Sequence, residues 1–549
     1  MLTLLLVTPL IGIFFMLLSN KEAPVKQAPG NYPPDVHLSA KSFSSISSLC
    51  LSTDKQTKNQ AGGLGPIGKN METSDVFASR STVQTIKTIA LATSIVNFFI
   101  SLVLWSNFDL NTSEFQFRAE YNELSFCHLT LGVDGISLFF IILTCLLFPI
   151  IFLADSKGLK ENVLTYQVIM LLLETLLIAV FTVKDILLFY IFFESILPPL
   201  FLLIGLFGSS KKVRASFHLF LYTLFGSLAM LLAFLTMYYL TGTTDIEVLS
   251  SVNLSFDLQK ILWLAIFFSF MIKFPLVPFH LWLPLAHSEA PLGGSILLAG
   301  VVLKLALYGS LRILIPLLPE ASIYFTPLVY TIGVITIIYA SLTTLRQIDM
   351  KVIIAYSSIG HVAIILMGAF SNNVAGIEGS IVLGIAHGFI SPALFILTGG
   401  CLYERYHSRI LSYYRGLTVN MPLFSIMFLL AMLGNIAVPL SSNFVGEWLC
   451  LAGAFGRSPV MAAAASSGMF LSAAYSIWML NRVIGGGFSP HLKVMPDLDR
   501  REFYVLFPLI ALAFALGIFP NVILDSIHYS VSTVLYQIMT TPMAPVACN

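Results

Sequence analysis

Runs of apolar residues long enough to cross a membrane recur along the whole chain, separated by short polar connectors. A helix of about twenty such residues crosses roughly 30 Å of hydrocarbon. With 57% hydrophobic and only 10% charged residues, the 549-residue chain is too apolar for a soluble fold of this length. The alternating pattern of barrel strands is absent, so helices must satisfy the backbone. The sequence therefore predicts an all-α polytopic membrane protein.

About fourteen transmembrane helices are predicted from length alone. The first segment, Met1 to Ser19, has neither a basic leader nor a small-residue cleavage site, which favours a retained span over a signal peptide. Two regions, 258–290 and 422–453, are predicted to be interrupted. The predicted spans are 1–19, 86–106, 134–154, 163–183, 186–207, 215–240, 258–278, 293–316, 324–344, 350–370, 377–403, 422–453, 461–484 and 503–534.

The chain divides by composition and pattern into five further parts after the first span. Residues 20–85 are rich in Ser, Lys, Gly and Pro and are predicted to form an extended extramembrane loop. N-terminal helices follow over 86–160. Two similar halves are predicted over 161–316 and 317–490, and a C-terminal loop and last helix over 491–549.

Lys and Arg gather in the connectors that follow odd-numbered spans. Connectors of this kind face the cytoplasm or its equivalent, so both termini are predicted on the opposite side of the membrane. Among these basic residues are Lys211, Lys212, Arg214, Arg346, Lys351, Arg405, Arg409 and Arg415.

Several classes of function find no support in the residues. Six scattered cysteines form no CxxC motif and no Cys/His cluster, so neither a disulfide framework nor a metal site is expected. A net charge of +1 and the lack of phosphate-binding glycine motifs argue against a nucleic-acid partner. No flavin, nicotinamide, haem or iron–sulfur pattern is present, so no cofactor is expected in this chain.

Four ionisable residues interrupt apolar runs: Glu194, Lys273, Lys304 and Glu447. A single charge at membrane depth costs about 2.5–3.5 kcal/mol on insertion scales, so a retained one has a structural or functional reason. These residues are interpreted either as static ion pairs that hold helices together or as stations of a proton relay. Four together favour the relay.

Prolines next to two of these charges predict broken helices. Pro275 and Pro278 follow Lys273, and Pro439 precedes Glu447. Proline removes a backbone donor, and a broken helix is tolerated at membrane depth where it lines a hydrated cavity. Paired breaks are typical of inverted-repeat transporters. The predicted fold therefore has two inverted repeats, each containing a broken helix.

Histidines extend the polar pattern, because imidazole titrates near neutral pH. Taken singly, each is more often a packing residue than a proton carrier. His361 and His387 lie inside apolar segments between Lys304 and Glu447 in chain order, which favours a polar axis. The supporting residues predicted around this axis are His280, His287, Tyr356, Ser357 and Ser358.

Other charges are given ordinary roles. Glu289 and Arg312 lie near span ends and are expected to be solvated. Glu378 is expected to favour a helix N-terminus, and Asp134 to cap one. His218 is given no role.

Several blocks resemble one family closely: "FYIFFESILPPLFLLIG", "KFPLVPFHLWLPLAHSEAPLGGSILLAGVVLKLALYGSLR", "LRQIDMKVIIAYSSIGHV", "HGFISPALFILTGG" and "NFVGEW". From about residue 86 onward the chain resembles the chain 4 family of NADH:ubiquinone oxidoreductase, respiratory complex I. These are antiporter-like proton-pumping subunits related to the Mrp cation/proton antiporters. The resemblance implies two antiporter-like half channels over 161–316 and 317–490.

The resemblance also implies roles. Glu194 and Lys273 would form the charge pair of the first half channel and Lys304 the bridge to the second. His361 and His387 would lie on the connecting axis, and Glu447 would be the terminal site. NAD, FMN, iron–sulfur clusters and ubiquinone would belong to partner subunits, with structural phospholipids bound. The expected partners are other complex I membrane subunits, neighbouring antiporter-like chains included, in the mitochondrial inner membrane or, alternatively, a bacterial plasma membrane.

Three features depart from the family pattern. The 20–85 connector is unusually long, Leu285 stands where many relatives carry Lys or Arg, and no long lateral C-terminal helix is expected after the last span.

Two other functions stay open at this point. One is a stand-alone cation/proton antiporter, and the other is a structural membrane spacer whose buried charges are static pairs.

Overall fold

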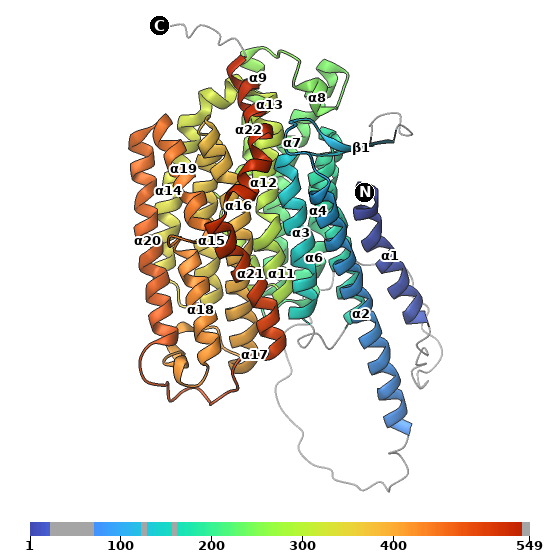
Figure 1. Cartoon of the computed structure of the whole chain (residues 1–549), viewed down its shortest axis with the longest axis vertical. Coiled ribbons are helices and arrows are strands. Elements are labelled where there is room, and N and C mark those ends of the chain that lie inside the picture. The colour runs from blue at the N-terminus through green and yellow to red at the C-terminus, as the bar shows by residue number, and fades with distance from the viewer. Residues whose placement is uncertain (22–70, 122–128, 156–161, 541–549) are drawn as a thin grey trace, which may run out of the picture.

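Long helices run side by side through the computed structural model, which describes residues 1–21, 71–121, 129–155 and 162–540 (Figure 1). Within those ranges twelve helical segments are long and apolar enough to cross a membrane. Two more cross as interrupted helices, α9 with α10 and α18 with α19. The predicted polytopic helical fold and both predicted interruptions are confirmed.

The described residues up to Leu249 form eight helices and one hairpin. The hairpin, β1 (Gln116–Tyr121) antiparallel to β2 (Leu129–Val133), was not predicted. It covers one end of α4, where the Lys184 N–H donates to the Thr130 carbonyl at 3.1 Å. The helices are α1 (Leu2–Lys21), α2 (Met71–Ser106), α3 (Gly135–Ala154), α4 (Val163–Thr182), α5 (Ile186–Ser195), α6 (Leu197–Phe207), α7 (Lys212–Thr241) and α8 (Ile246–Leu249).

The second half contains three π-helical segments, which the sequence did not predict. They are η1 (Leu298–Val302), η2 (Ser310–Leu314) and η3 (Ile396–Leu402); two 3₁₀ turns are η4 (Leu411–Tyr413) and η5 (Leu417–Val419). The α-helices are α9 (Phe256–Lys273), α10 (Trp282–Glu289), α11 (Leu292–Leu297), α12 (Lys304–Gly309), α13 (Ile315–Leu317), α14 (Pro319–Arg346), α15 (Met350–Ala369), α16 (Val374–Phe395), α17 (Tyr403–Tyr406), α18 (Pro422–Asn435), α19 (Ser442–Arg457), α20 (Pro459–Ile484), α21 (Arg500–Ile518) and α22 (Asn521–Thr540).

Two predicted boundaries differ from the structure. Of the predicted loop 20–85, residues 22–70 lie outside the described residues, but α2 already begins at Met71, because no Gly or Pro interrupts 71–106. The predicted last span, 503–534, is two helices. Pro520 cannot continue α21, and α22 packs against α3 and α16 instead, with Ser530 Oγ accepting from the Gly135 N–H at 3.1 Å.

Each interrupted helix is closed by a side chain from beyond its break. The indole N–H of Trp282 donates to the carbonyl of Ile272 at 2.9 Å, and the Asn443 amide donates to the carbonyl of Gly434 at 2.9 Å. Both acceptors are carbonyls in the last turn before a break. The Gly434 carbonyl also accepts from the Ala437 N–H at 3.2 Å, and a buried carbonyl left unpaired would cost about 1–3 kcal/mol. α9 and α18 start at opposite ends of the molecule (Figure 1), as inverted repeats require.

Three charges assigned ordinary roles are more buried than expected. Asp134 caps α3 as predicted, but it also pairs at 3.2 Å with Arg312, whose side chain is only 11% exposed and lies over the ring of Phe115. Glu289 is buried and accepts from the Lys211 N–H at 2.9 Å. Solvation of Arg312 and Glu289 was therefore a wrong prediction.

Glu378 also departs from its predicted role. α16 begins at Val374 with Asn373 as its cap, so Glu378 lies past the first turn. Its carboxylate is 2.7 Å from Nδ1 of His528 on α22. The interaction ties α22 to α16.

Glycines bring α16 and α19 into backbone contact. A Cβ on Gly446 would lie 2.6 Å from Leu383 Cα, and one on Gly379 would lie 2.7 Å from the backbone nitrogen of Cys450. Small residues allow such close approach in membrane bundles.

We predict that Gly446→Ala lowers the thermal unfolding midpoint of the purified protein, because overpacking costs about 1–3 kcal/mol. Gly456→Ala on the same helix is the control, since its new methyl group would meet nothing closer than 3.5 Å. Equal midpoints for the two variants would contradict the close packing described here.

Candidate functional site: a buried polar axis

Four predicted residues form one buried chain through the second half of the protein. Lys304 Nζ lies 2.9 Å from His387 Nδ1, and His361 Nδ1 lies 2.7 Å from Glu447 Oε1. The two imidazole rings are 5.7 Å apart between centroids. All four residues are at most 2% exposed. The chain Lys304–His387–His361–Glu447 is called the axis below.

A π-helical segment places Lys304 on the axis. Lys304 lies two residues past the end of η1, and its ammonium donates to the carbonyl of Ala299, which lies inside that wider turn. Glycine then lets α16 lie close to η1, since a Cβ on Gly388 would lie 3.2 Å from the carbonyl oxygen of Gly300. His387 on α16 is thereby held beside Lys304.

The second helix break places Glu447 at the other end of the axis. Ser441 caps α19 by accepting from the Phe444 N–H at 3.3 Å. In the break before it, Ala437 and Leu440 have positive φ angles of 61° and 79°. Non-glycine residues held there cost about 1–3 kcal/mol each and are enriched at functional sites.

A small cavity opens beside Glu447 and His361. Its volume is about 10 Å³, and its lining includes Ser341, Ser472 and Tyr475. A polar cavity of this size holds about one water molecule.

Glu194 and Lys273 lie near each other without forming a closed ion pair. Lys273 ends α9 and is 2% exposed, and its ammonium lies 4.2 Å from the ring centroid of Phe193. Glu194 lies at the end of α5. Among the described residues neither the ammonium nor the carboxylate has a hydrogen-bond partner, and no contact within 4.0 Å joins them, although they interact electrostatically. The predicted pair is present in an open arrangement.

Buried polar atoms without a hydrogen-bond partner recur at the predicted site residues. Each such atom costs about 1–3 kcal/mol unless water or another group satisfies it, and more when charged. Among the predicted site residues they belong to Glu194, Lys273, His280, His287, His361, His387 and Glu447. Other such atoms lie elsewhere in the described residues, on Gln259, Ser269 and Tyr330 among others.

The supporting residues have mixed surroundings. His287 stacks on Phe395 with ring centroids 4.7 Å apart, and His280 packs edge-on against Tyr356 at 6.1 Å. The hydroxyls of Ser357 and Ser358 both lie within hydrogen-bonding distance of the Ile354 carbonyl, and Ser358 Oγ is 3.1 Å from Ser391 Oγ. Pro275 and Pro439 lie in the two breaks.

Lys351 is a buried charge that sequence reasoning assigned to a surface connector. It is 5% exposed, and its ammonium donates to the Ala290 carbonyl at 3.3 Å and to Ser295 Oγ at 3.4 Å. Gly399 in η3 makes room for it, because a Cβ there would collide with Lys351 Cε. The sequence feature that could have indicated the burial of Lys351 was its position one residue inside an apolar helix.

A cleft of about 690 Å³ reaches Lys351 from the end of the protein that carries the basic connectors. Asp155, Glu404 and Arg409 also line it, so its charges are mixed. Beyond Lys351, His287 interacts electrostatically with both Lys351 and Lys304. The cleft, Lys351 and His287 thus lead toward the axis.

Asp155 lies in this cleft just past the end of α3. Its carboxylate accepts from the Tyr166 hydroxyl and, at 3.0 Å, from the Gly293 N–H. Burial raises the pKa of Asp155 from 3.8 to about 6, despite both hydrogen bonds.

A second missed charge is Glu174, in the middle of α4. It is fully buried and accepts from the Asn97 amide at 2.6 Å, while Asn97 accepts from Thr8. The rule that singled out Glu194 applies equally to "MLLLETLLIA" and could have found it.

Comparisons with known proteins identify the family of this chain. The family described as "NADH:quinone oxidoreductase/Mrp antiporter, TM" matches residues 183–472, which include every residue of the axis. The chain is 58% identical over 460 residues to NADH-ubiquinone oxidoreductase chain 4 of Mycosarcoma maydis, covering 84% of this chain and 95% of the relative.

Two solved structures share the fold. A chain of respiratory complex I from Thermus thermophilus has a TM-score of 0.76 at 27% identity, covering 82% of this chain and 95% of that one. A chain of the Mrp complex from Dietzia sp. has a TM-score of 0.74 at 18% identity, covering 85% and 96%.

We predict that the stability of the protein falls as pH rises from 5 to 7, by about 1 kcal/mol from Asp155 alone. Its pKa is higher in the folded state, so the folded protein keeps a proton that the unfolded chain has released. Asp155→Asn should reduce the pH dependence of the thermal unfolding midpoint. Asp257→Asn, at a side chain 92% exposed, should leave it unchanged. Identical pH profiles for wild type and Asp155→Asn would refute the assignment.

Proposed function

Because the chain belongs to the NADH:quinone oxidoreductase/Mrp antiporter membrane family, we propose that it is a proton-translocating subunit of NADH:ubiquinone oxidoreductase. The observation that carries the proposal is the axis, in which Lys304 contacts His387 and Glu447 contacts His361, with the two buried imidazole rings 5.7 Å apart between centroids. Static ion pairing does not account for an ammonium hydrogen-bonded to a neutral imidazole at this depth.

The contacts of the axis are compatible with proton transfer from Lys304 to Glu447 in this proposal. With Lys304 as donor to His387 Nδ1, the neutral His387 ring carries its hydrogen on Nε2. With His361 Nδ1 as donor to Glu447, His361 Nε2 is an acceptor. A proton given by Lys304 to His387 then releases the one on Nε2, which a water molecule between the rings carries to His361, since neither Nε2 has a protein partner among the described residues.

Glu194 and Lys273 act as the gate in this proposal. When the carboxylate approaches the ammonium, Coulomb attraction keeps the proton on Lys273; when the two separate, desolvation favours its release. The open arrangement, with the ammonium over Phe193, corresponds to the releasing state.

Protons enter in this proposal through the cleft at the basic end, where Lys351 and His287 pass them to Lys304. Connectors of this charge face the matrix in a mitochondrial inner membrane. The eukaryotic relatives support that location, and redox chemistry with NAD, FMN, iron–sulfur clusters and ubiquinone then belongs to partner subunits of the complex.

We predict that Lys273→Met abolishes proton pumping in the assembled complex reconstituted into liposomes, because no group remains to hold the gated proton. The readout is the ratio of protons translocated to NADH oxidised. Lys260→Met lies on the same helix, in a surface pair with Asp257, and should pump normally. An unchanged ratio for Lys273→Met would reject the relay in favour of static pairs.

Cation/proton exchange by the chain alone in liposomes would favour the stand-alone antiporter.

We also predict that Lys351→Met lowers the proton-to-electron ratio at least several-fold, since it removes the only ammonium between the cleft and His287 among the described residues. Lys212→Met, at an exposed ammonium on the same end, is the matched control. If Lys351→Met pumps normally while Lys273→Met does not pump, the proposed proton entry through the cleft and Lys351 is wrong, but the proposed role of Lys273 stands.

A further inference from the structure

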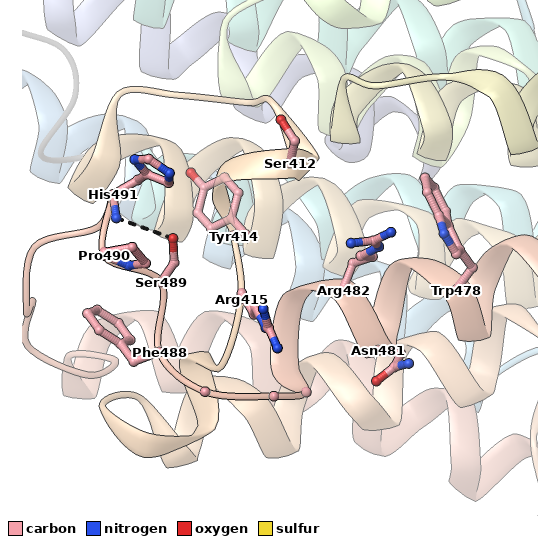
Figure 2. A pocket seen from close by; sticks show the side chains of 13 residues that line it. Ser412, Tyr414, Arg415, Trp478, Asn481, Arg482, Phe488, Ser489, Pro490 and His491 are labelled. Carbon is pink, nitrogen blue, oxygen red and sulfur yellow. Dashed lines mark hydrogen bonds between the residues drawn. The ribbon is translucent and has the colours of Figure 1, made fainter.

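A second cleft at the basic end, of about 660 Å³, lies outside the axis and its approaches. It is enclosed by the last turn of α20, the 412–415 segment and the 485–491 segment (Figure 2). Arg415, Asn481 and Arg482 line it, with Trp478 and His491 at its sides.

Positive charge distinguishes this cleft from the mixed cleft at Lys351. None of its thirteen lining residues is acidic. Within the described residues the guanidinium groups of Arg415 and Arg482 take part in no ion pair or side-chain hydrogen bond. Two unpaired guanidinium groups in one concave site are suited to an anion with several oxygens, above all a phosphate, which each can bind through two N–H groups.

The walls of the cleft are fixed by hydrogen bonds between two segments distant in sequence. The Gly416 N–H donates to the Gly485 carbonyl at 3.0 Å, and the Ser489 N–H donates to the Arg415 carbonyl at 3.2 Å. Gly486 has a φ of 84°, and a Cβ there would lie 2.7 Å from Arg415 Nε. The turn thus supports the Arg415 side chain, and the site is preformed.

An apolar strip on α20 leads directly to the cleft. Phe470 is 80% exposed and Ile477 is 55% exposed, and they lie two helical turns apart on one face. Asn481 follows Ile477 by one turn, and Arg482 follows Trp478 by one turn. A ligand that matches both features has an anionic head and an apolar tail, and tryptophan at such a boundary is typical of the membrane interface.

We propose that the cleft binds the phosphate of an anionic phospholipid, held by Arg415 and Arg482, with its acyl chains along the Phe470–Ile477 face of α20. The leaflet facing the basic connectors is the one in which anionic lipids attract Lys and Arg. The site would fix the end of α20, which packs on α14, α18 and α19 beside Glu447.

The test is lipid retention by the assembled complex, delipidated and then incubated with mixed micelles of phosphatidylcholine containing phosphatidylglycerol. Retained lipid is measured by mass spectrometry. Arg415→Gln with Arg482→Gln should weaken phosphatidylglycerol retention at least about tenfold, because both charged donors to the phosphate are lost. Lys212→Gln with Arg214→Gln removes the same charge from the same end and should retain the lipid.

Three outcomes would overturn the proposal. They are equal retention by the double arginine variant, equal retention of phosphatidylcholine and phosphatidylglycerol by wild type, and cross-linking of the site to an acidic segment of a partner chain in place of lipid. Arg415→Lys with Arg482→Lys keeps the charge should the glutamine variant not assemble. It should show weaker but measurable selectivity, because lysine cannot bind phosphate through two N–H groups. Free inorganic phosphate should not displace the lipid, since it lacks the apolar tail.

Discussion

The desolvation of ionisable side chains is the constraint on which this structure depends. An ammonium or carboxylate at membrane depth is stable only when another group or water satisfies it, and the rest of the bundle is arranged around that need. The Lys304 ammonium is satisfied by the Ala299 carbonyl and His387, and the Glu447 carboxylate is satisfied by His361. Glu194 and Lys273 meet that need least, since neither charged group has a hydrogen-bond partner among the described residues, and our proposal places the gate there.

Irregular helices make these contacts possible. Trp282 and Asn443 donate to carbonyls in the last turn before the two breaks, and the π-helical segments place Lys304 and make room for Lys351. Regular helices would satisfy their own backbones and leave the polar side chains facing apolar neighbours. The helix breaks and π-helical segments thus lower local stability at the places where polar groups lie inside the membrane.

Much of this could be predicted from sequence, because a charge inside an apolar run is a local signal. Glu194, Lys273, Lys304 and Glu447 were found in that way, and prolines located both breaks. Arg312 was missed because its burial depends on a distant partner, Asp134, that no local pattern reveals. For Lys351 the only local signal was its position one residue inside an apolar helix, while its partner Ser295 is distant in sequence. No amino-acid composition distinguishes the π-helical segments from α-helix. The turn at Pro520 was not predicted because apolar residues flank it on both sides.

The most direct test of the central claim is a density map of the assembled complex at a resolution that shows ordered water. The account predicts water molecules within hydrogen-bonding distance of the Lys273 ammonium, of Nε2 of both His361 and His387, and of Glu447. It also predicts that these waters connect the axis to the cleft at Lys351. A map in which those atoms are dry and unconnected to one another would contradict it.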